Sequence, residues 1–167
     1  ANQGKMQFGS AGAGAGTHIT CLLLNAGIGA EVTHVPYRST ALAMPDMLAG
    51  RIDYICEPVQ TGLPLIQSNA VKAIATLSRE RTAVLPNLLT AHEQGLTNFD
   101  APVWFALFLP KGAPNAIVNR LNNALSIALD DPAIRERLEG AGLRVAPVER
   151  RSPGYLAKFV VSEIEKY

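Results

Sequence analysis

A loop rich in glycine and alanine separates the first predicted strand from the first predicted helix. Residues 9–16 have the sequence Gly-Ser-Ala-Gly-Ala-Gly-Ala-Gly, between a strand pattern at residues 6–10 and an apolar helical run that begins near Ile19. Glycines let backbone N–H groups approach a ligand, and a helix N-terminus favours negative charge. The segment is therefore typical of an anion site, although a tight structural turn explains this feature equally well.

The spacing of the glycines argues against a nucleotide loop. A G-x-G-x-x-G loop that began at Gly12 would need glycine at position 17, where the chain has Thr17. A phosphate loop would need Gly-Lys followed by Ser or Thr, and no such run follows. A carboxylate or another small oxyanion fits better. Ser10 and Thr17 would add hydroxyl donors, and Thr17 is also predicted to cap the helix.

Strand and helix patterns alternate along the chain. The predicted strands lie at residues 6–10, 31–35, 52–56, 71–77, 103–109 and 144–148. The predicted helices lie at residues 17–26, 39–49, 59–67, 90–94, 114–129, 131–140 and from 152 onward. Such alternation predicts an α/β fold with largely parallel sheets. The run at 103–109 is apolar without alternation, which predicts a strand buried on both faces.

Composition excludes several classes of partner. The formal net charge is +1, from 15 basic and 14 acidic residues without a basic stripe, so no nucleic acid partner is expected. No run approaches the length of a membrane span. The charged fraction of 17% is below the roughly 25% of ordinary soluble domains, so we expect something else to cover part of the surface.

The cysteines and histidines do not form a recognisable catalytic or metal pattern. Cys21 and Cys56 are too few for a disulfide framework, and two buried free thiols are favoured over a pair. His34 and His92 lack metal-ligand spacing with any cysteine or acidic pair, so we expect no metal and no cofactor. His18 and Cys21 are three residues apart, but no third group would orient them for catalysis.

Polar residues follow two of the predicted strands. Tyr37 and Arg38 follow the strand at 31–35, and Glu57 follows the strand at 52–56. Ligands of open α/β sheets bind at the carboxyl ends of strands. Glu57 could accept a hydrogen bond from a ligand amine, hydroxyl or ordered water, or it could be a solvated loop charge. His18 could donate to a ligand carboxylate, or it could pack locally.

Short motifs then occur in a characteristic order along almost the whole chain. They are Phe8-Gly9-Ser10-Ala11-Gly12, Thr17-His18, Val35-Pro36-Tyr37-Arg38-Ser39, Leu48-Ala49-Gly50-Arg51-Ile52-Asp53, Leu85-Pro86-Asn87, Glu93-Gln94-Gly95-Leu96, Trp104-Phe105-Ala106-Leu107-Phe108 and Lys111-Gly112-Ala113-Pro114. In series, these motifs resemble the extracytoplasmic receptors of the tripartite tricarboxylate transporters, the Bug family.

The resemblance implies a type II periplasmic-binding-protein fold, with two α/β lobes around a hinged cleft. It also implies that the N-terminal part of one lobe is missing from this chain. Residues 1–77 would form the second lobe, which carries the ligand loop. Residues 78–100 would form the hinge or connection, and residues 101–167 the C-terminal part of the first lobe. The implied location is the periplasm, with the signal peptide lost together with the missing segment.

The implied function is that of a solute receptor and not an enzyme. It would capture a small carboxylate or dicarboxylate by hinged closure and present it to the membrane subunits of the transporter. The expected ligand-binding residues are Ser10, Ala11, Gly12, Gly14, Thr17, His18, Tyr37 and Glu57, with Glu57 standing where the family more often has Asp. The alternative is an α/β enzyme domain whose loop binds a phosphorylated cofactor. The absence of an acid–base pair or nucleophile from the sequence pattern disfavours that alternative.

The missing segment has a consequence for the strand at 103–109. Without its neighbours in the sheet, the edges and faces of this strand would be exposed, which invites pairing with another chain. If the chain folds by itself, we therefore expect a homo-oligomer, a swapped dimer, or a complex with the missing segment as a separate peptide.

Overall fold

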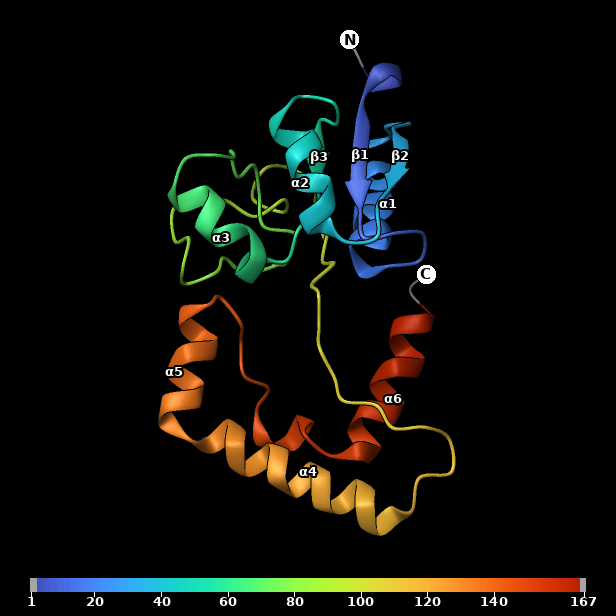
Figure 1. Ribbon diagram of the computed structural model, residues 1–167, viewed down its shortest axis with the longest axis vertical. Helices are drawn as coiled ribbons and strands as arrows, with labels where there is room; N and C mark the ends of the chain where they lie inside the picture. The colour runs from blue at the N-terminus through green and yellow to red at the C-terminus, as the bar shows by residue number, and fades with distance from the viewer. Residues whose placement is uncertain (1–2, 166–167) are drawn as a thin grey trace. The chain divides into compact units, whose positions relative to one another are not determined.

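The chain folds into two compact units, which divide between Val103 and Trp104. The structure is a computed structural model that describes residues 3–165. All the strands that it describes lie in the first unit, and the second unit contains helices α4 to α6 (Figure 1). Over residues 3–165, no helix combines the length and the hydropathy that a membrane span requires.

A parallel sheet forms the centre of the first unit. Its strands are β1 (Gln7–Ser10), β2 (Thr33–Pro36) and β3 (Tyr54–Ile55), in the order β2-β1-β3. The central strand β1 is buried from Phe8 onward. Parallel neighbours need crossover connections, which helices α1 (Gly16–Ile28) and α2 (Thr40–Leu48) provide. The α/β prediction is therefore confirmed.

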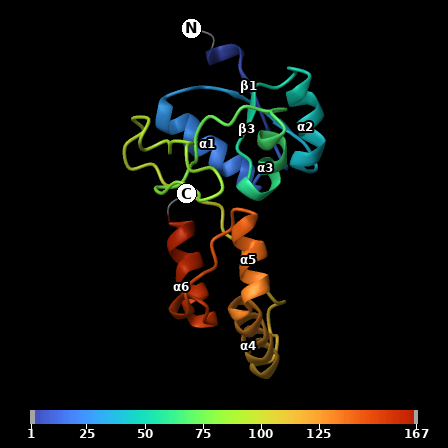
Figure 2. The same cartoon turned by 90° about the vertical axis from the view of Figure 1, so that its left-hand side faces the viewer.

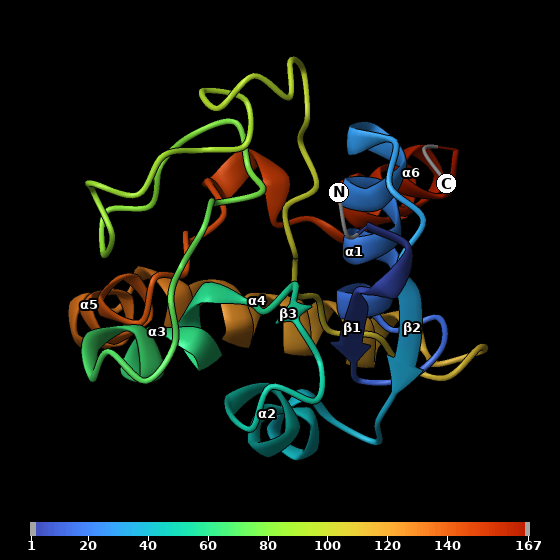
Figure 3. The same cartoon turned by 90° about the horizontal axis from the view of Figure 1, so that it is seen from above.

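The helices of the first unit cover both faces of this sheet. Helices α1 and α2 lie on opposite sides of the strands (Figure 2), an arrangement that is also seen from above (Figure 3). Helix α3 (Val59–Gln67) follows β3 with the predicted bounds. Helix α1 ends at Gly29, whose left-handed φ of +64° suits a glycine C-cap. Its N-cap is Ala15 rather than Thr17, so the predicted Thr17 cap is wrong.

Gly9 allows the close packing of α2 against the sheet. A Cβ atom at this position would lie 2.6 Å from Ile52 Cδ1 and 3.2 Å from Ala43 Cβ. Both neighbours are buried, and 2.6 Å is too short a contact for Ile52 Cδ1 to remain in place. The glycine that opens the loop is therefore also required by the core.

A disulfide joins Cys21 on α1 to Cys56, which follows β3. Both residues are buried in the cluster that contains Phe8, and their Cα atoms lie 5.5 Å apart. The prediction of two free thiols is therefore wrong. Sequence spacing could not show the pair, because two cysteines 35 positions apart meet only when α1 packs against the sheet.

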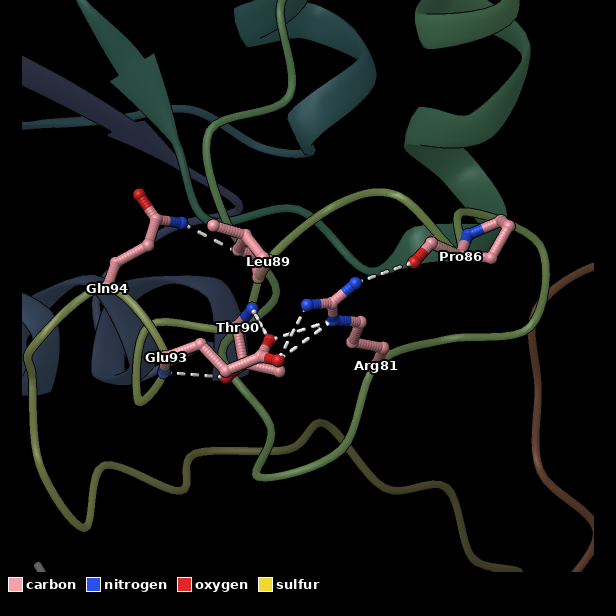
Figure 4. Close-up of polar contacts among 6 residues, drawn as sticks. All are labelled: Arg81, Pro86, Leu89, Thr90, Glu93 and Gln94. Carbon is pink, nitrogen blue, oxygen red and sulfur yellow. Dashed lines mark hydrogen bonds and ion pairs between the residues drawn. The ribbon is translucent and has the colours of Figure 1, made fainter.

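The segment after α3 has less regular structure than the sequence predicts. The expected strand at 71–77 is wrong, since only Thr76 forms a bridge, to Thr90. The expected short helix at 90–94 is a turn. Hydrogen bonds between side chains and backbone take the place of regular structure here. The Glu93 carboxylate accepts from Thr90 N–H at 2.8 Å, and Thr90 Oγ1 accepts from Glu93 N–H at 3.0 Å (Figure 4).

Arg81 completes this network. Its Nη2 donates to Glu93 Oε1 at 2.7 Å, and its Nη1 donates to the Pro86 carbonyl at 3.1 Å (Figure 4). The guanidinium, together with the Thr90 N–H, lowers the pKa of Glu93 to about 2. A charged pair therefore closes the loop between residues 81 and 93.

The second unit consists of α4 (Asn115–Asp130), α5 (Pro132–Gly140) and α6 (Pro153–Ile164). Asp131 and Ser152, the first residues of the predicted helices at 131–140 and from 152, are the N-caps of α5 and α6. Asp131 Oδ1 accepts from the N–H groups of Ala133 and Ile134, and Ser152 Oγ accepts from Tyr155 N–H. The expected strand at 144–148 is wrong, because the structure there is irregular and leads into a short 3-10 helix, Val148–Arg150.

The apolar segment at 103–109 is not a strand. The structure assigns it no ladder partner among residues 3–165, and Phe105 and Phe108 are 65% and 60% exposed. The prediction of a strand buried on both faces is therefore wrong for this chain. The exposure follows from the absence of neighbouring strands, because an extended segment is buried only where other strands or helices cover it.

Candidate functional site

The loop between β1 and α1 is shaped by two glycines with positive φ. Gly12 has φ +113° and Gly14 has φ +78°. L-residues rarely adopt these conformations, so glycine is required at both positions. At Gly12 a Cβ would also lie 3.3 Å from the Tyr37 carbonyl oxygen. The loop therefore lies against the residue that follows β2.

Two hydroxyl groups hold the loop from within. Thr17 Oγ1 accepts a hydrogen bond from Ala11 N–H, and Ser10 Oγ accepts one from Gly12 N–H, each at 3.0 Å. Ser10 is fully buried and Thr17 is 8% exposed. These contacts place both hydroxyls as internal acceptors for the loop amides.

His18 has a tautomer that the loop determines. Its Nδ1 accepts a hydrogen bond from Gly14 N–H at 3.1 Å. An accepting Nδ1 carries no proton, so the neutral ring has its hydrogen on Nε2. The His18 Nε2–H has no hydrogen-bond partner within residues 3–165, so this N–H is free to donate to a ligand.

Three backbone amides at this end of α1 are also unpaired. Over the described part of the chain, the N–H groups of Ala13, Gly16 and Thr17 make no hydrogen bond, whereas Ala15 N–H donates to the Gly12 carbonyl. Gly16 and Thr17 lie in the first turn of α1, where N–H groups lack an intrahelical partner. This end of the helix can therefore donate hydrogen bonds to an anion.

Tyr37 contacts the loop through its backbone. Its N–H donates to the Ser10 carbonyl at 3.1 Å, while its hydroxyl donates to Asp46 Oδ2 at 2.8 Å. Arg51 Nη1 also contacts Asp46, at 2.7 Å. The hydrogen bond to Asp46 raises the pKa of Tyr37, and the bonds from Tyr37 and Arg51 lower the pKa of Asp46. The phenol is thus engaged away from the loop.

Glu57 presents one unpaired oxygen. Its Oε1 accepts from Thr40 Oγ1 at 2.9 Å and from Thr61 Oγ1 at 2.5 Å. Its Oε2 is buried and has no hydrogen-bond partner among the residues that the structure describes. Buried carboxylate oxygens are normally satisfied, so Oε2 needs a donor. No hydrogen bond joins Glu57 to the loop, whereas the other expected site residues are linked by the contacts above.

His34 also contributes to this site, although its spacing in the sequence bears only on metal binding. Its Nε2 lies 2.6 Å from Ser10 Oγ, and its ring stacks on His18 with a centroid distance of 4.0 Å. Burial, and then the neighbouring His18, lower the pKa of His34. The parallel register places His34 beside Phe8, a pairing that the sequence alone does not reveal. Among the described residues, no cluster could hold a metal ion.

Comparisons with known proteins agree with this fold. The family model described as "Tripartite tricarboxylate transporter family receptor" matches residues 1–167. A protein from the TAR-I ttuE-ttuC' intergenic region of Agrobacterium vitis is 34% identical over 165 residues, which are 99% of this chain and 48% of that protein. Protein BugT of Bordetella pertussis is 29% identical over 167 residues, 100% of this chain and 50% of that protein. The chain spans about half the length of these curated relatives.

Solved structures match over the same extent. MatC from Rhodopseudomonas palustris with bound malate has a TM-score of 0.93 at 36% identity, covering 99% of this chain and 56% of that chain. The periplasmic binding protein BugD has a TM-score of 0.90 at 32% identity, covering 99% and 55%. The predicted periplasmic-binding-protein fold is therefore confirmed, for a chain that matches about half of such a protein.

Proposed function

We propose that this chain, which belongs to the tripartite tricarboxylate transporter receptor family, is part of a periplasmic receptor that captures a small carboxylate or dicarboxylate. The observation that carries this proposal is the group of unpaired donors at the N-terminal end of α1. The similar protein MatC, solved with malate bound, supports a dicarboxylate as ligand. The receptor releases its ligand unchanged.

The N–H groups of Ala13, Gly16 and Thr17 and the His18 Nε2–H are the proposed donors to one carboxylate. A hydrogen bond to a charged group contributes about 1.5–3 kcal/mol, and the helix N-terminus adds a favourable potential. Ser10, Ala11, Gly12 and Gly14 keep the loop in shape, and Tyr37 borders it. These roles divide the expected site between groups that touch the ligand and groups that hold the loop.

Glu57 is the proposed selectivity residue. Its buried, unpaired Oε2 would accept a hydrogen bond from a ligand hydroxyl, amine or ordered water. An unsubstituted aliphatic chain offers no such donor, so its binding would leave Oε2 unsatisfied. This arrangement favours dicarboxylates that carry a polar substituent or retain an ordered water.

The proposed mechanism is closure of two lobes around the ligand. Residues 1–77 form the lobe with the ligand loop, residues 78–100 the connection, and residues 101–167 part of the other lobe. A ligand that binds the closed state more tightly shifts the population toward it. The closed receptor then delivers its solute to membrane transporter subunits. The disulfide between Cys21 and Cys56 suits an oxidising compartment such as the periplasm.

Binding without chemistry is also part of the proposal. Cys21 is bonded to Cys56 and cannot act as a thiolate nucleophile beside His18. Phosphorylated cofactors would be the expected ligands of an enzyme domain with this loop, so they provide the contrasting arm of the test below.

We expect malate to raise the melting temperature of a chimera that joins residues 1–167 to the half of the Agrobacterium vitis relative that they do not match. At a ligand concentration of about 100 times Kd, the added stability is about 2.7 kcal/mol. ATP and NAD should have no effect. Thermal unfolding with each compound makes the measurement, and stabilisation by ATP or NAD without any effect of malate would contradict the proposal.

The exposed segment at 103–109 is the proposed docking site for that other half. Its apolar side chains are exposed in this chain, and the relatives are about twice as long. An extended segment with unpaired N–H and C=O groups accepts another strand by backbone hydrogen bonding. The occupant in the whole receptor is a strand from the half that residues 1–167 do not match.

By itself, the chain is expected to self-associate through this segment. Size-exclusion chromatography with light scattering should give a mass above the 17.8 kDa of one chain. Adding the substitutions Phe105→Ser and Phe108→Ser should shift the population toward monomer. Ile127→Ser, at a 73% exposed site on α4, is the matched control and should leave the mass unchanged. A monomer at all concentrations would contradict this expectation.

A further inference from the structure

The buried hydroxyl of Ser10 connects the ligand loop to β2. Ser10 Oγ lies 2.6 Å from His34 Nε2, 3.0 Å from the Gly12 nitrogen and 3.2 Å from the Gly12 carbonyl oxygen. The Gly12 N–H must donate to Oγ, so the single hydroxyl hydrogen goes either to His34 or to the Gly12 carbonyl. The shorter distance favours His34. The result is two linked hydrogen bonds, in which Gly12 N–H donates to Ser10 and Ser10 O–H donates to His34.

These two linked hydrogen bonds require His34 to be neutral, with its hydrogen on Nδ1. If Nε2 acquired a proton, it would become a donor to Ser10 Oγ, and the hydroxyl hydrogen would turn to the Gly12 carbonyl. Oγ would then accept from both His34 and Gly12, and the two hydrogen bonds would no longer strengthen each other. The protonation state of His34 therefore sets how firmly the Gly12 amide is held.

We propose that neutral His34 is a positioning residue, which fixes the Ser10 hydroxyl and through it the Gly12 amide of the carboxylate-binding loop. This inference rests on the function proposed above. His34 does not touch the carboxylate itself. Its effect is to hold the loop, whose unpaired amides then need less reordering when the ligand arrives.

The surroundings of His34 keep it neutral near pH 7. From α1, His18 stacks on it at 4.0 Å; from β1, Phe8 stacks on it at 4.9 Å, and Phe8 in turn stacks on Tyr54 of β3. His18 is the titratable group in direct contact, and a proton on either ring repels a proton on the other. Burial and His18 lower the pKa of His34 below 6.5. The stabilisation from neutral His34 is therefore present above pH 6.5 and is lost as the pH falls through the folded-state pKa.

Two substitutions separate the hydrogen bond from the ring stack. His34→Phe keeps an aromatic ring against His18 but removes the acceptor, whereas His34→Gln keeps an acceptor oxygen that does not titrate. We expect hydrogen exchange at Gly12 N–H to become about tenfold faster in His34→Phe and malate affinity in the chimera to fall about fivefold. His34→Gln should stay within about twofold of wild type in both measurements. These sizes correspond to one hydrogen bond. His92→Gln is the control, because His92 accepts from Asn98 N–H outside this site.

Nuclear magnetic resonance of the wild-type chain tests the coupling without any variant. As the pH is lowered, the Gly12 amide and the His34 ring should titrate with one midpoint, below 6.5. A Gly12 amide that shows no inflection at the His34 midpoint overturns the inference, and so does unchanged Gly12 exchange in His34→Phe. If the Gly12 amide titrates with His34 but malate fails to bind the wild-type chimera, the positioning role of His34 is supported and the carboxylate function is contradicted.

Discussion

Removal of the Cys21–Cys56 disulfide is expected to lower the free energy of unfolding by about 3–4 kcal/mol. The estimate follows from the loop that the bond closes, since the cysteines are 35 residues apart and cross-linking reduces the entropy of the unfolded chain accordingly. Small domains have a total stability of about 5–15 kcal/mol, so the loss is a large fraction. Urea unfolding of Cys21→Ala/Cys56→Ala against wild type measures it.

A reductant provides the internal control for this experiment. Dithiothreitol should destabilise the wild-type chain toward the level of the double variant and should leave the double variant unaffected. If the two cysteines acted only as small buried apolar groups, reduction would have little effect on wild type. An unfolding midpoint that is the same with and without reductant would therefore contradict a stabilising disulfide.

The second large effect is expected at the ligand loop. In the chimera, Ser10→Ala combined with Thr17→Ala should weaken malate binding at least about tenfold, as measured by titration calorimetry. Each substitution removes the acceptor of one loop amide, Gly12 N–H for Ser10 and Ala11 N–H for Thr17. At the typical value of about 1 kcal/mol each, two lost hydrogen bonds exceed the about 1.4 kcal/mol that a tenfold change requires.

The matched control removes a hydroxyl that holds no part of the loop. Ser162→Ala deletes an Oγ that donates to the Phe159 carbonyl within α6, and malate affinity should stay unchanged. Equal affinities in wild type and in the Ser10/Thr17 double variant would show that the loop does not depend on these hydroxyls. The proposed role of the loop in binding would then be wrong.

Local features were predictable from the sequence because neighbouring residues determine them. The helices predicted to start at Asp131 and Ser152 do so, since each short polar side chain accepts from N–H groups two or three residues ahead. The loop conformation is local too, because glycine can adopt the positive φ of Gly12 and Gly14 without a steric penalty. Thr17 departs from its prediction because a contact within the loop, to Ala11, competes for its hydroxyl.

Strand predictions failed where a strand needed a partner. The patterns at 71–77, 103–109 and 144–148 are apolar enough for strands, but the structure forms no ladder there over residues 3–165. A strand is stable only when another strand supplies its hydrogen bonds. An apolar segment is expected to be buried, but its sequence does not identify the strand or helix that covers it.

The amino-acid order alone determined the strand–loop–helix unit, the helix starts at Asp131 and Ser152 and the α/β class, because these depend on backbone preferences and on side chains a few residues apart. Only tertiary packing decided that Cys21 meets Cys56, that His34 reaches Ser10, and that one oxygen of Glu57 stays unpaired. The first two contacts join residues 24 or more positions apart. The third depends on which residues surround the Glu57 carboxylate after folding. They arise when α1 and α2 pack on opposite faces of one sheet, a geometry that no short stretch of sequence encodes.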